Sequence, residues 1–453
     1  MLRSSGIRKV LRTGGLMAVC ALAGGALFNV SSVSSRSRAS GSTAERNSAS
    51  LVTQGRRIFR FDDFGDDAFW SGALQLDKAI AGSKNGGVGP GVSPATALKL
   101  GLKVDASALP KSVVNAIKAG KVDLNDPATT LALLKLNAVV GVKGHFTSSG
   151  KLSSIGLTCA VCHSTVNNSF APGIGQRRDG WPNRDLNVGA IISAAPNLKP
   201  VTDVLGVDEA TVKKVLASWG PGKFDAELFM DGRAFQPDGR SAATLIPPAY
   251  GLAGVNLHTY TGWGSVPYWN AFVAVLEMHG QGNFTDARLD NAAKFPIAAK
   301  NRFGHVRVHG GQKDLVRAKL PALQAYELSL KAPKPPSKSF DHAAAARGKK
   351  LFDGGAGCAS CHMPPQFTDP GWNMHQPGEV CEDDFQASRS PDNAYRTTPL
   401  GGLGQRNLVK DPRFYHDGRF NSLGAVVDHY DGCNHLGLSA SQKSDLVEYL
   451  KSL

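Results

Sequence analysis

The residues with the clearest chemical potential are two short runs of cysteine and histidine that share one spacing. Each run has the form C-x-x-C-H, in which a histidine directly follows the second cysteine. This spacing is typical of c-type haem attachment, because the two thiols can form thioethers with the haem vinyl groups. The histidine then lies under the iron as its proximal ligand. The six residues are Cys159, Cys162 and His163 in the first run and Cys358, Cys361 and His362 in the second.

Paired cysteines also occur in other sites, as half of a zinc site or as a thioredoxin-like redox pair. The chain has two copies of the five-residue run behind a segment that reads as an export signal. This combination favours haem attachment over a zinc site and over a redox pair. We therefore expect two covalently bound haem c groups, with His163 and His362 as proximal iron ligands. The carbonyl of Pro364 is expected to orient the His362 ring. Met363 is too close in sequence to reach the opposite haem face.

The segments that must position the two runs differ in character. Residues 341–352 strongly favour a helix, which a glycine-rich stretch ends just before Cys358. The approach to the first run, residues 151–158, does not read as such a helix. The last helix is expected to begin with a capping box at Ser439 and Gln442 and to pack on residues 341–352.

The densest aromatic patch, residues 258–269, lies between the two runs and leads into a helix expected at 270–279. Aromatic side chains at this density usually build a core. Alternatively, a tryptophan of the patch relays electrons between the haems, and a histidine at either end of this region faces the first iron. The four candidate catalytic residues are therefore Trp263, Trp269, His258 and His279.

The chain of 453 residues is long enough for two or three domains. Residues 1–40 read as a signal peptide and polar leader, because a basic start precedes an apolar run too short to span a bilayer comfortably. Residues 51–330 are expected to hold an N-terminal extension and the first haem domain. A proline-rich linker at 331–339 leads to the second, residues 340–453. The expected fold is mainly α, with two cytochrome c-like haem domains, long loops and an N-terminal helical extension. Three further helices are expected at 111–119, 128–140 and 313–330.

The formal net charge is +14, and residues 1–40 contribute six Lys/Arg and no Asp/Glu to it. The remaining, mildly basic surface suits an acidic redox partner or an anionic membrane face. No nucleic-acid motif and no stable membrane span after signal removal is recognised. We expect a periplasmic or secreted protein that receives electrons from a redox partner protein or a small-molecule donor. Arg178 and Arg184 are candidates for contacts with haem propionates, although surface arginines are common.

Counting the seven cysteines leaves two without a role. Cys20 lies in the signal, and four belong to the C-x-x-C-H runs. Cys381 and Cys433 remain, and in an oxidising compartment a disulfide between them is the simplest expectation. Two unrelated buried thiols are the alternative.

Three stretches of the C-terminal third resemble the di-haem cytochrome c peroxidase and MauG-like superfamily, to which rubber oxygenases are also related. They are residues 347–352, 395–400 and 414–420, the last reading Phe-Tyr-His-Asp-Gly-Arg-Phe. The resemblance implies that the first haem meets peroxide or oxygen and that the second feeds it electrons. Calcium is often bound between the domains of the family, so Ca²⁺ is a further candidate cofactor. The alternative function is a non-catalytic electron carrier with two six-coordinate haems.

The resemblance also implies a distal ligand for the second haem. The family places a methionine or tyrosine in the helix after His416, and that position falls on Tyr430. We favour the neighbouring His429, because imidazole binds both ferric and ferrous iron well. Met374 and His375, in the loop after the second run, remain further alternatives.

Overall fold

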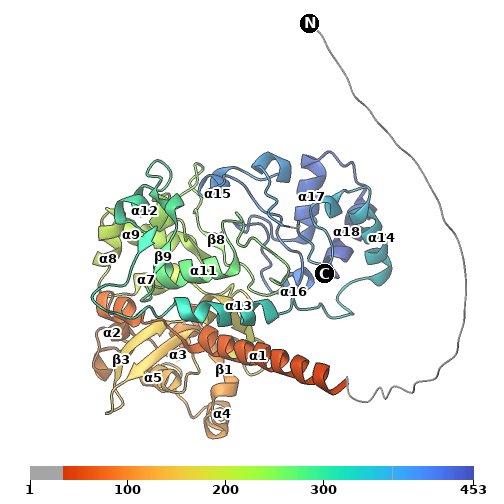
Figure 1. Ribbon diagram of the computed structural model, residues 1–453. Coiled ribbons are helices and arrows are strands. Elements are labelled where there is room, and N and C mark those ends of the chain that lie inside the picture. Colours follow the sequence, from red (N-terminus) through yellow and green to blue (C-terminus); the bar gives the residue numbers. More distant parts are fainter. Residues whose placement is uncertain (1–33, 370) are drawn as a thin grey trace, which may run out of the picture. The chain divides into compact units, whose positions relative to one another are not determined.

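The computed structural model describes residues 34–369 and 371–453, so most of the expected signal and leader lies outside the described residues. Residues Ser48–Leu453 form one compact unit. The chain is mainly helical with short two-stranded sheets, as predicted (Figure 1). Within the described residues, no helix combines the length and the apolar character that a membrane crossing requires.

The α-helices are α1 (Ser34–Phe61), α2 (Leu76–Ala81), α3 (Pro94–Lys99), α4 (Lys111–Lys118), α5 (Pro127–Lys135), α6 (Ala160–His163), α7 (Val188–Ser193), α8 (Lys199–Leu205), α9 (Glu209–Trp219), α10 (Leu228–Asp231), α11 (Val266–Phe272), α12 (Pro296–Asn301), α13 (Leu320–Ser329), α14 (His342–Asp353), α15 (Phe385–Ser388), α16 (Leu403–Asn407), α17 (Leu423–Cys433) and α18 (Ala440–Lys451). The strands are β1 (Val104–Asp105), β2 (Val142–Phe146), β3 (Leu152–Leu157), β4 (Ser164–Val166), β5 (Ile174–Gly175), β6 (Arg177–Asp179), β7 (Lys223–Phe224), β8 (Thr244–Leu245), β9 (Phe284–Thr285) and β10 (His305–Val306). The β1–β5 pair is parallel, whereas β2–β3, β4–β6, β7–β8 and β9–β10 are antiparallel.

The first C-x-x-C-H run is approached by a β-hairpin, β2–β3, which explains why residues 151–158 did not read as a helix. The hairpin is fixed by Asp66, whose two carboxylate oxygens accept the Leu157 N–H at 3.1 and 3.2 Å. Burial, together with the nearby Asp63, raises the pKa of Asp66 to about 9. The Asp66 carboxyl is therefore protonated in the folded protein at neutral pH.

The C-terminal segment, residues 340–453, is built around the pairing of α14 with α18 that the sequence predicted (Figure 1). Asp341 caps α14, and the capping box of Ser439 and Gln442 begins α18. The helices meet at Gly348, where a Cβ atom would lie 2.0 Å from the Asp445 carbonyl oxygen. Only glycine permits this approach. The segment has an apolar cluster of its own, which includes Phe352, Leu403, Phe414, Leu423, Leu446 and Tyr449.

Several helix boundaries differ from the sequence expectation. The helix expected at 128–140 ends at Lys135, because Asn137 adopts a left-handed φ of 52°. The helix expected at 313–330 begins at Leu320, directly before Pro321. The helix expected at 270–279 begins earlier as α11 and continues as a π-helical turn, Val273–Glu277.

A buried ionic cluster joins the C-terminal segment to the first half of the unit. Arg389 has no exposed surface, and its guanidinium contacts Asp225 at 2.9 Å and Asp231 at 2.8 Å. It also donates to the Ala242 carbonyl at 3.3 Å. The three charged side chains are fully or almost fully buried, so their pairing replaces the water that each would otherwise bind.

Candidate functional site

The first C-x-x-C-H run lies in the wall of a cavity of about 550 Å³. The run folds into the single turn α6, with Cys159 at its start, so that Cys159, Cys162 and His163 all line the cavity. A volume of this size is in the range of cofactor and ligand pockets. The residues of the run therefore lie together in the wall of a cavity that is large enough for a cofactor.

The His163 ring is oriented for metal binding through its outer nitrogen. Its Nδ1 lies 3.2 Å from the Pro247 carbonyl oxygen, which can only accept a hydrogen bond. The proton therefore resides on Nδ1, and Nε2 keeps its lone pair. Burial lowers the pKa of His163 to about 4, so the ring is neutral at pH 7. Burial also raises the pKa of the Cys162 thiol to about 12.

Much of the cavity wall is apolar, and the N-terminal extension, the hairpin, α7–α9 and residues 224–279 all contribute to it. Residues 51–142, the N-terminal extension, thus form part of the site. Its contribution includes Leu76, Ile80, Val92, Leu102, Leu134 and Val139. The polar side chains that reach the cavity include His258, Tyr260, Glu277, Glu327 and Arg396.

The sequence analysis missed three glutamates that line the cavity, Glu227, Glu277 and Glu327. Burial raises the pKa of Glu277 well above its usual value and that of Glu327 to about 7. Asn270 donates to Glu327 at 2.7 Å, whereas Glu277 Oε1 has no hydrogen-bond partner within the described chain. Glu277 ends the π-helical turn after α11, and the wider turn changes which side chains face inward. A regular helical period therefore does not reveal it.

Three of the four candidate catalytic residues line the cavity: His258, His279 and Trp269. His258 Nε2 lies 3.1 Å from the Val255 carbonyl oxygen, and burial lowers the pKa of His258 to about 4. The His279 ring stacks on Phe69 with 3.6 Å between centroids.

Trp263 lies elsewhere, in the apolar core. Its ring stacks on Phe295 with 5.5 Å between centroids and packs against Phe272. Core packing, which the sequence analysis left open, is the arrangement found for this tryptophan.

Buried guanidinium groups provide a test of whether the site fits a haem with its two carboxylates. Arg396 lines the cavity, and burial lowers its pKa to about 10. Its NH1 atom and that of Arg184 are buried without a hydrogen-bond partner among the described residues. Buried cations are costly unless an anion accompanies them, and haem propionates would supply such anions. Arg178, the other predicted contact, is exposed and lies over the Trp181 ring at 4.8 Å.

At the second run, the predicted role of Pro364 is wrong. His362 Nδ1 lies 3.0 Å from the Phe367 carbonyl oxygen, because the chain folds back under the ring five residues later. The Phe367 carbonyl engages Nδ1 as the Pro364 carbonyl was expected to do, so Nε2 remains the nitrogen that can bind a metal. Gly357 begins the short turn that holds Cys358 with a left-handed φ of 65°.

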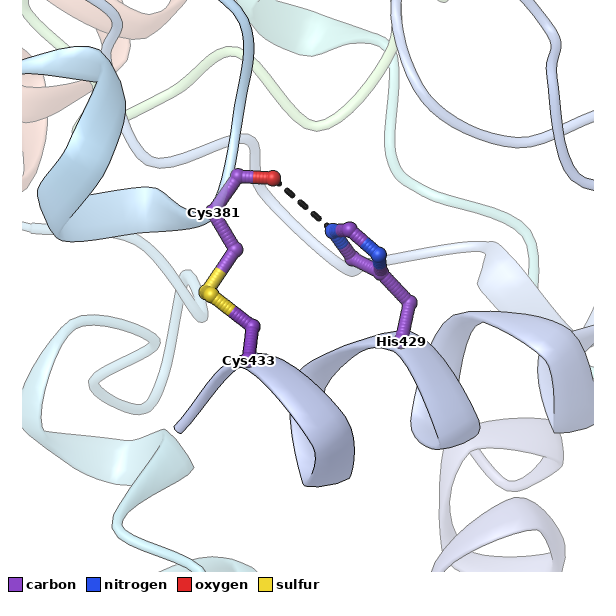
Figure 2. The surroundings of a disulfide bond; sticks show 3 residues. All are labelled: Cys381, His429 and Cys433. Atoms are coloured by element: carbon purple, nitrogen blue, oxygen red, sulfur yellow. Dashed lines mark hydrogen bonds between the residues drawn. A yellow bond between two sulfur atoms is a disulfide. The ribbon is translucent and has the colours of Figure 1, made fainter. Parts of the chain in front are cut away.

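The disulfide between Cys381 and Cys433 is present, as predicted, and it ties the loop at 377–382 to the end of α17 (Figure 2). His429 points to this loop, with its Nε2 2.8 Å from the Cys381 carbonyl oxygen. Tyr430, one residue on, is half-buried, and its pKa is raised to about 12 by burial and by neighbours that include the Cys358 thiol.

His375 and Met374, the other candidates for the distal ligand of the second haem, contact other groups. His375 pairs with the Asp369 carboxylate through Nε2, and Met374 packs beside Gly262.

For calcium, Glu382 and Asp383 lie together beside His416. Arg419 contacts both of these carboxylates, and its positive charge disfavours a cation there.

The class of the chain is indicated by two kinds of feature. They are the two C-x-x-C-H turns, whose histidines present Nε2, and the motifs at 347–352, 395–400 and 414–420. The chain resembles the di-haem cytochrome c peroxidase and MauG-like superfamily. The methylamine utilization protein MauG of Methylorubrum extorquens supports this: it is 29% identical over 277 residues, which cover 50% of this chain and 76% of MauG. No protein-family model matches the chain.

Two solved structures are also similar to part of the chain. Hydrazine synthase of Kuenenia stuttgartiensis is 18% identical, with a TM-score of 0.28, over 48% of this chain and 75% of its own. A MauG-like protein associated with microbial copper homeostasis is 16% identical, with a TM-score of 0.30, over 48% of this chain and 76% of its own.

Proposed function

We propose that the chain is an exported di-haem c-type cytochrome that acts as an oxidoreductase. It uses peroxide or oxygen at the first haem, with electrons relayed through the second from a redox partner protein or a small-molecule donor. The observation that carries the proposal is the cavity over the first C-x-x-C-H run. One wall holds the thiols and the free His163 Nε2, and the cavity also has room and protonatable groups for a reaction.

The haems, when bound, supply the redox chemistry. The residues of the chain hold the haems, orient the iron ligands and supply protons. His163 would hold the iron through Nε2 while the Pro247 carbonyl fixes the ring, and Arg396 would neutralise propionate charge. Glu277 and Glu327 hold protons in a water-poor cavity, where peroxide needs two protons and two electrons to become two water molecules. The apolar wall excludes bulk water from this reaction.

At the second haem, we propose His362 as proximal ligand and Tyr430 as distal ligand, in place of the favoured His429. One contact supports the change. The His429 Nε2 is engaged by the Cys381 carbonyl, and this leaves Tyr430, the position that the resemblance to the family implies, as the candidate on α17. A site closed on both faces suits electron transfer, because no exogenous molecule competes for the iron.

A second candidate function is a non-catalytic electron carrier in which both haems are six-coordinate. It is favoured by the two imidazoles of His258 and His279, since both line the first cavity. In this function, one of the two imidazoles is the distal ligand of the first iron.

Haem content and ligand binding test the proposal. Protein matured in a host that attaches c-type haem should give two haems in the pyridine haemochrome assay. Cys162→Ser and its matched counterpart Cys361→Ser should each disturb attachment at one site only. Carbon monoxide or cyanide should bind at the first haem, and hydrogen peroxide should oxidise the reduced protein in stopped-flow mixing. If neither haem binds an added ligand in any redox state, the electron carrier is the correct function.

A further inference from the structure

Aromatic side chains form a path from the first cavity to α17 that bypasses the tryptophans. Tyr260 lines the cavity, and its ring centroid lies 6.2 Å from that of His416. Tyr415 precedes His416 in the chain, and its ring lies 6.0 Å from that of Tyr430. The path therefore joins the wall of the first site to the proposed distal ligand of the second.

His416 is the centre of this path and is held on several sides. It is buried, and the Tyr395 ring lies 5.5 Å from its own. Its backbone carbonyl accepts the Leu245 N–H at 2.7 Å, and Leu245 also lines the first cavity. His416 thus contacts the cavity wall both through a ring and through a backbone hydrogen bond. A fixed, buried ring is suited to electronic coupling because its geometry does not fluctuate with solvent.

Tyr260 is fixed as well. Its carbonyl accepts the Arg396 N–H at 3.1 Å, and the Arg396 side chain donates to the Thr259 carbonyl. Trp263, by contrast, packs against Phe272 and Phe295 within the apolar core. Trp263 therefore belongs to the core around α11, and Trp269, which lines the first cavity, packs against Trp263 and Phe272.

We propose that Tyr260 and His416 provide the electronic coupling between the two haems. The inference rests on the proposed function, in that both C-x-x-C-H runs carry haem. In each event one electron leaves the second iron and arrives at the first, and no bond forms or breaks in either side chain. The external donor restores the electron to the second iron. Two such transfers, with two protons, reduce one peroxide to two water molecules at the first site.

The test is the rate at which an electron redistributes between the haems after a sub-stoichiometric pulse of photochemical reductant. No peroxide is used, so the result is independent of reactivity at the first haem. Tyr260→Leu and His416→Leu should each slow redistribution by about tenfold, which corresponds to about 1.4 kcal/mol in the barrier. Tyr260→Phe keeps the ring and should retain the wild-type rate. Trp263→Phe, away from the path, is the matched control.

Each variant is first checked for two haems and an unchanged circular dichroism spectrum. His416→Gln replaces His416→Leu if the leucine variant does not fold. Wild-type rates in the Tyr260→Leu and His416 variants overturn the proposal, as does slowing that occurs only on replacing Trp269. A chain that attaches a single haem removes the proposed function and the coupling together. Fast redistribution without peroxide oxidation refutes the catalytic function alone.

Discussion

Replacing Arg389 by methionine should strongly destabilise the protein without touching either C-x-x-C-H site. The guanidinium contacts Asp225 at 2.9 Å and Asp231 at 2.8 Å, in a place where Arg389 and Asp225 have no exposed surface. Methionine fills much of the volume but leaves two carboxylates without their cation. Removing one partner of a buried ion pair costs about 3–5 kcal/mol, so we expect a loss of this size at neutral pH.

The loss should depend on pH in a defined direction. Burial raises the pKa of Asp225 to about 7 even though Arg389 lowers it. Without the guanidinium, this pKa rises further, so the folded variant binds more protons than the folded wild-type protein as pH falls. Protonation removes the unpaired charge, and the destabilisation should therefore be smaller at pH 5 than at pH 8.

Guanidinium chloride unfolding, followed by circular dichroism at both pH values, measures the effect. Arg347→Met is the matched control, because Arg347 pairs with Asp445 at an exposed site, and its midpoint should stay unchanged. Adding Asp225→Asn and Asp231→Asn to the Arg389 variant should recover part of the stability. A loss below about 1 kcal/mol, the range of an exposed ion pair, would refute the reasoning.

Three further predictions concern single side chains. Tyr430→Phe should convert the low-spin second haem to high spin in the electronic spectrum, whereas His429→Gln should not; the reverse result restores the histidine. Cys433→Ser opens a disulfide between residues 52 apart, and chemical unfolding should show a loss of up to about 4 kcal/mol; no loss would mean that the loop is held without the bridge. Asp66 keeps its proton to about pH 9 when folded but loses it near its ordinary value of 3.8 when unfolded, so its contribution to stability declines as pH rises between these values. The melting temperature of Asp66→Asn relative to wild type should therefore increase from pH 5 to pH 8, and a constant difference would contradict the assigned pKa.

The features that the sequence predicted correctly depend on local patterns. The mainly helical fold, the glycine-rich end of α14, the capping box of α18 and the pairing of the two helices follow from capping residues and periodicity over a few turns. The disulfide followed from counting cysteines, and the relation to MauG-like proteins followed from short motifs. None of these inferences needed the distance between remote parts of the chain.

The features that were missed depend on contacts between remote residues. Glu277 and Glu327 look like ordinary helical glutamates, and only the packing around the cavity buries them. Arg389 pairs with Asp231, which lies 158 positions earlier in the chain. The choice of Phe367 rather than Pro364 as the His362 partner depends on the path of one loop. Sequence periodicity carries no information about any of these distances.

The close approach of α14 and α18 at Gly348 makes the segment before the second C-x-x-C-H run depend on a helix far along the chain. The first helix of the C-terminal segment precedes the second C-x-x-C-H run, but the surface on which it packs belongs to the last helix of the described structure. Because an isolated helix of this length is marginal in water, α14 cannot settle until α18 has been delivered. The turn that holds Cys358 and Cys361 follows α14 directly, so its position also depends on a helix that comes about 80 residues later in the chain.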